Sequence, residues 1–145
     1  MHTITLSFIY QNKGLTMIYT VTTTQNLHTV KAELESQAKE VGFGLLNTYD
    51  FKQILHTKGY PIEKEITVFE ICNPPGAQQA LSLIAEISVY LPCRISIYEN
   101  DGQTTLATIG IEEMLGTADF NENFKTHMIL IYENLKRVMH SWDTH

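Results

Sequence analysis

The sequence has little positive charge, few cysteines and no long apolar run. Of its 145 residues, 10 are Lys or Arg and 16 are Asp or Glu, so the formal net charge is −6. A general nucleic-acid or anionic-membrane surface needs a cationic stripe, so this balance argues against both partners. Two cysteines are too few for a disulfide scaffold. No apolar run reaches the roughly 20 residues of a membrane-spanning helix, and the first residues lack the basic start of a secretory signal. We therefore expect a cytoplasmic protein with reduced cysteines.

The amino-acid composition and the length are typical of a folded globular protein. Hydrophobic residues make up 43% of the chain and charged residues 18%, which argues against disorder. The length suits one domain, since about 150 residues per domain is the usual prior.

Residue periodicity predicts an α+β fold. Alternating or β-branched segments predict strands over 17–24, 43–49, 65–72, 94–99 and 103–109. Apolar steps of three and four predict helices over 27–41, 74–84 and 121–142. A short helix or turn is expected over 50–58, a helical turn over 111–115, and a hairpin turn at Asn100, Asp101 and Gly102. The order β-α-β-β-α-β-β-α predicts a two-layer sandwich: an antiparallel or mixed sheet of about five strands, with helices on one face.

The first 16 residues stand apart from this pattern. Ile4, Leu6, Phe8 and Tyr10 alternate with smaller residues, and residues 11–14 are typical of a turn. Two interpretations stay open. Residues 1–16 are an extra edge strand, or they are a disordered extension ahead of a single domain over 17–145.

Three motifs carry a resemblance to a known family. They are the strand from Met17 (Met-Ile-Tyr-Thr-Val-Thr-Thr-Thr), the run from Phe69 (Phe-Glu-Ile-Cys-Asn-Pro-Pro) and the run from Leu91 (Leu-Pro-Cys-Arg-Ile-Ser-Ile-Tyr-Glu). The chain resembles, over residues 17–142, the prokaryotic family known as domain of unknown function 302 (DUF302). The resemblance implies a small α+β domain that is often dimeric, and it implies no particular reaction.

Cys72 is the best single candidate for chemistry. It ends the third predicted strand, directly ahead of the helix that Pro74 opens. The residue before a proline is pushed out of the helical region, which leaves Cys72 just outside the first turn. There the free amides and the positive end of the helix dipole favour a thiolate. Glu70 opposes this effect, because alternation places it on the same face and a nearby carboxylate raises a thiol pKa. The alternative is a buried structural cysteine.

Cys93 and Arg94 begin the fourth predicted strand on opposite faces. Cys93 alternates with isoleucines, which indicates a core cysteine. If the third and fourth strands pair, Arg94 reaches Glu70 in a charge-assisted hydrogen bond. Cys72 and Cys93 then point to different sides of the sheet, and we expect no disulfide between them.

The start of the second long helix has two interpretations. Asn73 is a good helix cap. A bound anion at the same helix start is the alternative, but Pro74 and Pro75 remove two of the donors that would hold it. The candidate ligand-binding residues are Cys72, Asn73, Pro74, Cys93 and Arg94.

No complete catalytic or metal-binding motif is present. The six histidines show neither H-x-x-x-H nor H-E-x-x-H spacing, and the cysteines lack a C-x-x-C arrangement. The sequence predicts no metal and no cofactor, and it interprets the helical histidines, His140 among them, as solvated residues. The first functional hypothesis is a non-catalytic ligand-binding or interaction module that forms a homodimer. The alternative is thiol or persulfide chemistry at Cys72, tuned by Glu70 and Arg94, either alone or with a sulfur-relay protein.

Overall fold

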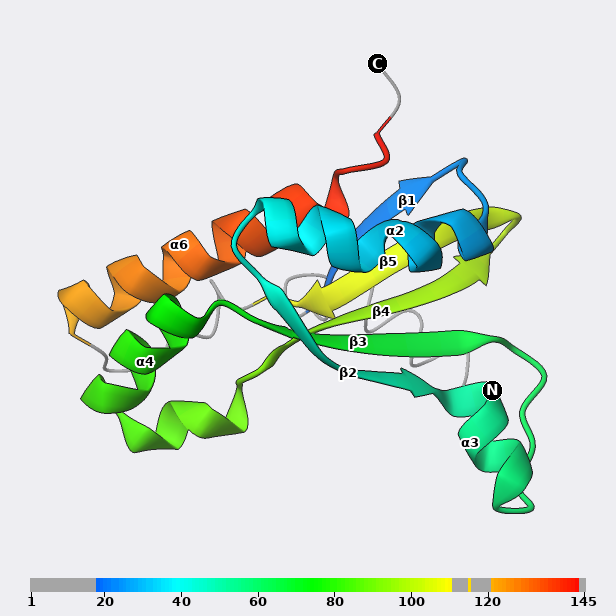
Figure 1. The fold of residues 1–145 in the computed structure, drawn as a ribbon, viewed down its shortest axis with the longest axis horizontal. Coiled ribbons are helices and arrows are strands. Elements are labelled where there is room, and N and C mark those ends of the chain that lie inside the picture. Colours follow the sequence, from blue (N-terminus) through cyan, green and yellow to red (C-terminus); the bar gives the residue numbers. More distant parts are fainter. Residues whose placement is uncertain (1–17, 111–114, 116–120, 144–145) are drawn as a thin grey trace, which may run out of the picture.

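A computed structural model describes residues 18–110, 115 and 121–143. A five-stranded antiparallel sheet in the order β1-β5-β4-β3-β2 forms one layer (Figure 1). Its strands are β1 (Ile18–Thr23), β2 (Gly44–Asp50), β3 (Ile66–Cys72), β4 (Cys93–Asn100) and β5 (Gln103–Ile109). The helices are α2 (Leu27–Glu40), α3 (Phe51–Thr57), α4 (Pro74–Leu83), the 3-10 helix η2 (Ala85–Val89) and α6 (Glu122–Met139).

The expected α+β class and element order are confirmed, and the sheet is entirely antiparallel. The sequence did not indicate η2. The expectations for residues 1–16 and for the helical turn over 111–115 fall largely outside the described residues, of which only Leu115 belongs to that turn. None of the described helices is long and apolar enough to cross a membrane.

Polar side chains fix where the helices begin. Asn26, Asp50, Asn73 and Asn121 each accept a hydrogen bond from the backbone N–H three residues later. This satisfies one of the amides that a helix start leaves unpaired.

The hairpin between β4 and β5 turns at Asp101 and Gly102, which both have positive φ (52° and 77°), as a two-residue hairpin requires.

The core lies between the helices and one face of the sheet. Leu34 of α2 and Ile95 and Ile97 of β4 are fully buried. The apolar stripe of α6 is buried as well and consists of Phe124, Met128, Ile131, Leu135 and Val138. At residue 76, α4 has no side chain, and a Cβ there would lie 2.8 Å from Ile131 of α6. The glycine at this position therefore allows α4 and α6 to pack closely against each other.

The strand register defines the second face of the sheet. Opposite residues of an antiparallel pair point to the same side. One row crosses all five strands in the order Tyr49, Val68, Ser96, Ala107 and Thr20. A neighbouring row pairs Asn47 with Glu70 and Glu70 with Arg94. The first row has small side chains at its centre and the second carries charge.

Candidate functional site

A hydrogen-bonded network of three side chains lies on the second face. The Nε of Arg94 donates to Oε2 of Glu70 over 2.9 Å, and the hydroxyl of Tyr49 donates to Oε1 over 2.9 Å. Glu70 is buried, whereas Arg94 is exposed. Burying a carboxylate is costly unless it is paired, and here both oxygens have a partner. The contact expected between Arg94 and Glu70 is present.

Tyr49 joins the network from the edge strand β2. Its ring stacks on Phe51 at a centroid distance of 6.2 Å. The hydrogen bond to Glu70, together with burial and the carboxylate charge, raises the pKa of Tyr49 above its ordinary 10.0. Tyr49 is therefore a neutral donor to the Glu70 carboxyl group.

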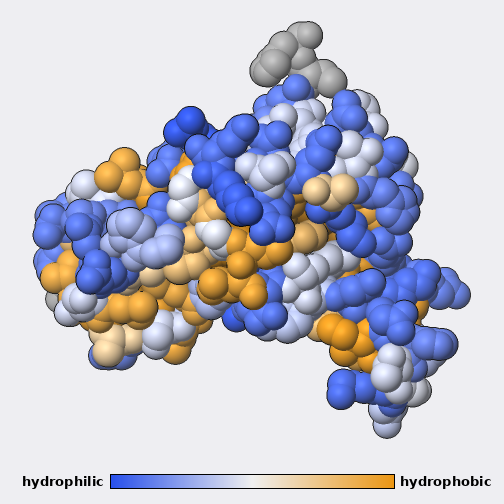
Figure 2. All heavy atoms as spheres, viewed as in Figure 1, coloured by the Kyte–Doolittle hydropathy of each residue, from blue (hydrophilic) through white to orange (hydrophobic). Residues whose placement is uncertain are grey.

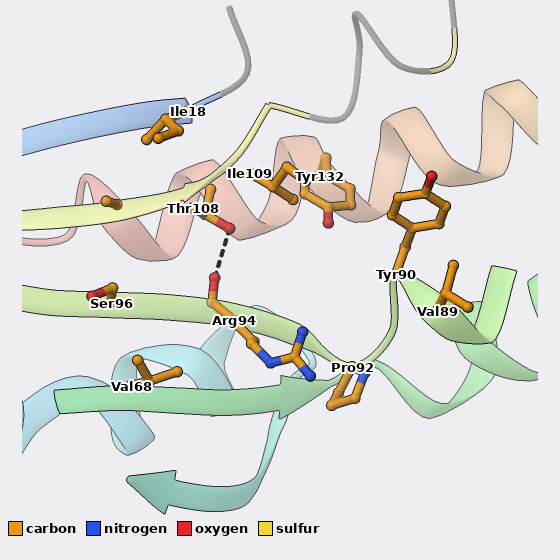
Figure 3. Close-up of a pocket in the computed structure, with 11 residues that line it drawn as sticks. Ile18, Val68, Val89, Tyr90, Pro92, Arg94, Ser96, Thr108, Ile109 and Tyr132 are labelled. Atoms are coloured by element: carbon orange, nitrogen blue, oxygen red, sulfur yellow. Dashed lines mark hydrogen bonds between the residues drawn. The ribbon is translucent and has the colours of Figure 1, made fainter. Parts of the chain in front are cut away.

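A largely apolar cavity of about 570 Å³ opens beside this network (Figure 3). Its floor is Val68, Ser96 and Ala107, neighbours on β3, β4 and β5. The small side chains of Ser96 and Ala107, next to Val68, leave room for the cavity above the sheet. The remaining lining residues come from the ends of β1 and β5, from the segment before β4 and from α6: Ile18, Thr108, Ile109, Val89, Tyr90, Pro92, Arg94 and Tyr132.

Arg94 is the only positively charged residue among the described residues that line the cavity. Its backbone is fixed, because the hydroxyl of Thr108 donates to the Arg94 carbonyl oxygen over 2.6 Å. Its Nε is held by Glu70. Within the described part of the chain, neither terminal nitrogen of its guanidinium has a hydrogen-bond partner. The cavity thus combines apolar walls with one planar set of free donors.

The two cysteines are both free and face opposite sides of the sheet. Ile71 pairs with Cys93, so Cys72 lies on the side of Glu70 and Cys93 lies in the core. The expectation that no disulfide joins them is confirmed. Burial raises the pKa of Cys93 to about 12, with a smaller contribution from Cys72, while a hydrogen bond with Tyr132 lowers it.

Cys72 is half-buried, and burial raises the pKa of its thiol above the ordinary 9.0. The helix start was expected to favour a thiolate. Instead the pKa of the thiol is raised, and the cause is desolvation by burial. Asn73 accepts from the Gly76 amide over 2.9 Å, so the capping interpretation of Asn73 is confirmed. Pro74 is the first residue of α4 and supplies no donor.

Of the six candidate residues, the structure brings Glu70 and Arg94 into contact and places only Arg94 on the cavity. Sequence analysis missed Tyr49 and the small residues of the cavity floor. The signal was present in the register: once the strands pair, Ser96 and Ala107 are neighbours on one face. Among the described residues, no group of three or more His, Cys, Asp or Glu side chains is arranged to hold a metal ion.

Comparison with known proteins identifies a family and a fold. The family model described as domain of unknown function DUF302 matches residues 19–142. A crystal structure of an uncharacterized conserved DUF302 protein from Bacillus stearothermophilus superposes with a TM-score of 0.78 at 23% identity. The match covers 87% of this chain and 98% of that one. No curated protein matches the chain.

Proposed function

The chain belongs to the DUF302 family, and we propose that its cavity beside Arg94 is a non-catalytic site that binds a small amphipathic anion. One observation carries this proposal. A largely apolar cavity of about 570 Å³ contains a single cationic side chain whose terminal nitrogens have no partner among the described residues. Ligand sites are commonly apolar cavities of this size with a few placed polar groups.

The two parts of the cavity select two parts of a ligand. The side chains of Val68, Ala107 and Ile109 suit an apolar body, which gains about 25 cal/mol for each Å² removed from water. The guanidinium suits a carboxylate or sulfonate, since parallel N–H donors match two anionic oxygens. Because Nε is held by Glu70, the head group meets the Nη atoms.

Glu70 also determines how the anion is recognised. Its carboxylate offsets the charge of Arg94, so the pair is formally neutral. The head group is therefore selected by directional hydrogen bonds more than by long-range attraction. We expect the affinity to fall only weakly between low and physiological salt.

Two dyes that differ by one group test the proposal. 8-Anilinonaphthalene-1-sulfonate carries a sulfonate, and N-phenyl-1-naphthylamine has the same ring system without it. We expect the wild-type protein to bind the sulfonate dye about fivefold or more tightly, or roughly 1 kcal/mol. Arg94→Gln removes this preference and leaves binding of the neutral dye unchanged.

Two further variants serve as controls. Arg137→Gln changes the chain's other arginine, which is exposed on α6, and keeps the wild-type preference. Ser96→Phe fills the cavity floor and weakens both dyes. Equal binding of the two dyes by the wild-type protein, or equal effects of the two arginine substitutions, contradicts the proposal.

The homodimer and the cytoplasmic location expected from the sequence stay predictions. Figure 2 shows apolar side chains gathered on the part of the surface formed by α4, η2 and the neighbouring part of α6. The exposed members are Leu81, Leu83, Val89, Ile129 and Leu130. Apolar patches of this kind are where protein surfaces associate, so we propose this surface for the second copy. The subunit count from native mass spectrometry tests it, and a monomer at all concentrations contradicts it.

A further inference from the structure

A second group of polar side chains lies on the other side of the sheet, where β1 meets the end of α6. The hydroxyl of Tyr19 and Nε2 of His140 are 2.6 Å apart, and Nδ1 of His140 and Oδ2 of Asp143 are 2.8 Å apart. Tyr19 and His140 are 121 positions apart in the sequence. Carboxylate, imidazole and hydroxyl thus form one continuous chain of hydrogen bonds.

The direction of these bonds follows from the chemistry of the groups. The Asp143 carboxylate accepts from Nδ1 of His140, and in the neutral imidazole this tautomer leaves Nε2 as an acceptor. The phenol of Tyr19 then donates to Nε2. This is the arrangement by which a carboxylate orients an imidazole, and the imidazole activates a hydroxyl.

The surrounding chain holds the three residues in place. The Asp143 amide donates to the His140 carbonyl over 3.1 Å, which closes a turn behind the imidazole. Between them, Trp142 is buried and clamps the segment at two points. Its Nε1 donates to Glu33 of α2 over 2.8 Å, and its carbonyl accepts from Thr23 of β1 over 3.0 Å. These contacts fix the backbone of residues 140–143, from which the His140 and Asp143 side chains extend.

His140 and Asp143 are open to solvent, Tyr19 is half-buried, and a cation lies beside the tyrosine ring. The His140 side chain is 43% exposed and that of Asp143 35%. The ammonium of Lys136 lies 4.8 Å from the centre of the Tyr19 ring. A cation over an aromatic face is attracted to the ring.

We propose that Tyr19 is an activated nucleophile for acyl-type electrophiles, with His140 as its general base and Asp143 as the residue that positions the imidazole. The Tyr19 oxygen forms a bond to the electrophilic carbon of an activated ester. The phenolic proton passes to Nε2 of His140, and the leaving group departs with its bonding electron pair. The imidazolium then returns the proton to the leaving group, so that His140 is regenerated and the acyl group remains on Tyr19.

Labelling with benzenesulfonyl fluoride tests the proposal, because its sulfur undergoes the same attack and gives a stable tyrosine ester. The internal reference is Tyr60, which is 76% exposed and whose hydroxyl is contacted by no histidine among the described residues. Peptide mass spectrometry measures the rate at each site. We expect Tyr19 to react at least about tenfold faster than Tyr60. This is less than the roughly 10²–10⁴-fold of general-base catalysis, because Tyr19 is half-buried and Tyr60 is exposed.

Substitutions separate activation from exposure. His140→Gln brings the Tyr19 rate down to that of Tyr60, and Asp143→Asn gives a smaller loss. The rate at Tyr60 stays constant as the reference for reagent activity, and an unchanged circular-dichroism spectrum shows that each variant keeps the fold. His56→Gln, on α3, is the matched control and leaves Tyr19 unchanged. A Tyr19 rate no higher than that of Tyr60 in the wild-type protein overturns the proposal. An undiminished rate in Asp143→Asn and His140→Gln does so as well.

Discussion

Glu70 holds Arg94 through one hydrogen bond, in which Nε of Arg94 donates to Oε2 of Glu70 over 2.9 Å. The side chain of Glu70 is 10% exposed, and that of Arg94 is 55% exposed. One buried carboxylate thereby fixes the plane of an exposed guanidinium at the wall of a cavity. In the proposed function, the rest of the guanidinium meets the ligand. The same side chain then forms the ion pair through Nε and the binding site through its Nη atoms.

The first prediction concerns stability. Arg94→Gln leaves the buried Glu70 carboxylate with Tyr49 as its remaining strong partner. Removing one partner of a buried polar group costs about 1–3 kcal/mol, and the exposure of Arg94 places the expected loss near the low end. Urea unfolding at pH 7 measures it. Arg137→Gln, whose partner Asn134 lies on the same exposed helix surface, is expected to change the free energy of unfolding by less than about 0.5 kcal/mol. Equal losses in the two variants would contradict the assignment.

Much of the fold followed from local sequence signals. Caps such as Asn26 and Asn73, the turn at Asp101 and the stripe of α6 are read from neighbours within a few residues, and these elements are all present. The pairing of Glu70 with Arg94 was also accessible, because it needs only the alternation of two adjacent strands.

The sites needed information that local patterns do not hold. The cavity depends on β5 lying between β4 and β1, which makes neighbours of residues far apart in the chain. Tyr19 and His140 meet only because α6 returns to the first strand. The pKa of Cys72 is raised, in the direction expected of a nearby carboxylate and opposite to that expected of the helix dipole. Its cause is burial, which is a property of the whole fold.

The second prediction concerns acid stability. Lys31 donates to Oε2 of Glu65 over 2.7 Å, and this hydrogen bond lowers the pKa of Glu65 below its ordinary 4.5. A lowered pKa in the folded state contributes stability above pH 4.5, which is lost as the pH falls through the folded value. Lys31→Met is therefore expected to cost about 0.5–1 kcal/mol at pH 7 and clearly less near pH 3, below the ordinary pKa of Glu65.

Urea unfolding at both pH values measures this difference. The control is Lys39→Met, since Lys39 and Glu35 are 3.6 Å apart and both exposed, and we expect it to change little at either pH. A cost of Lys31→Met that persists unchanged at pH 3 would show that the side chain acts through packing of its methylenes.

The last prediction decides between the proposed binding function and thiol chemistry at Cys72. Because the pKa of Cys72 is raised by burial, little thiolate is present at pH 7, and the thiolate is the reactive form. We expect Ellman's reagent to label Cys72 slowly at pH 7, with a rate that still rises with pH at pH 9. Cys93 is buried with a pKa of about 12, so it reacts only on unfolding. Cys72→Ser and Cys93→Ser assign the signals. A rate for Cys72 that is fast and already constant near pH 7 requires a stabilised thiolate, and it would favour sulfur handling at this position over an inert half-buried thiol.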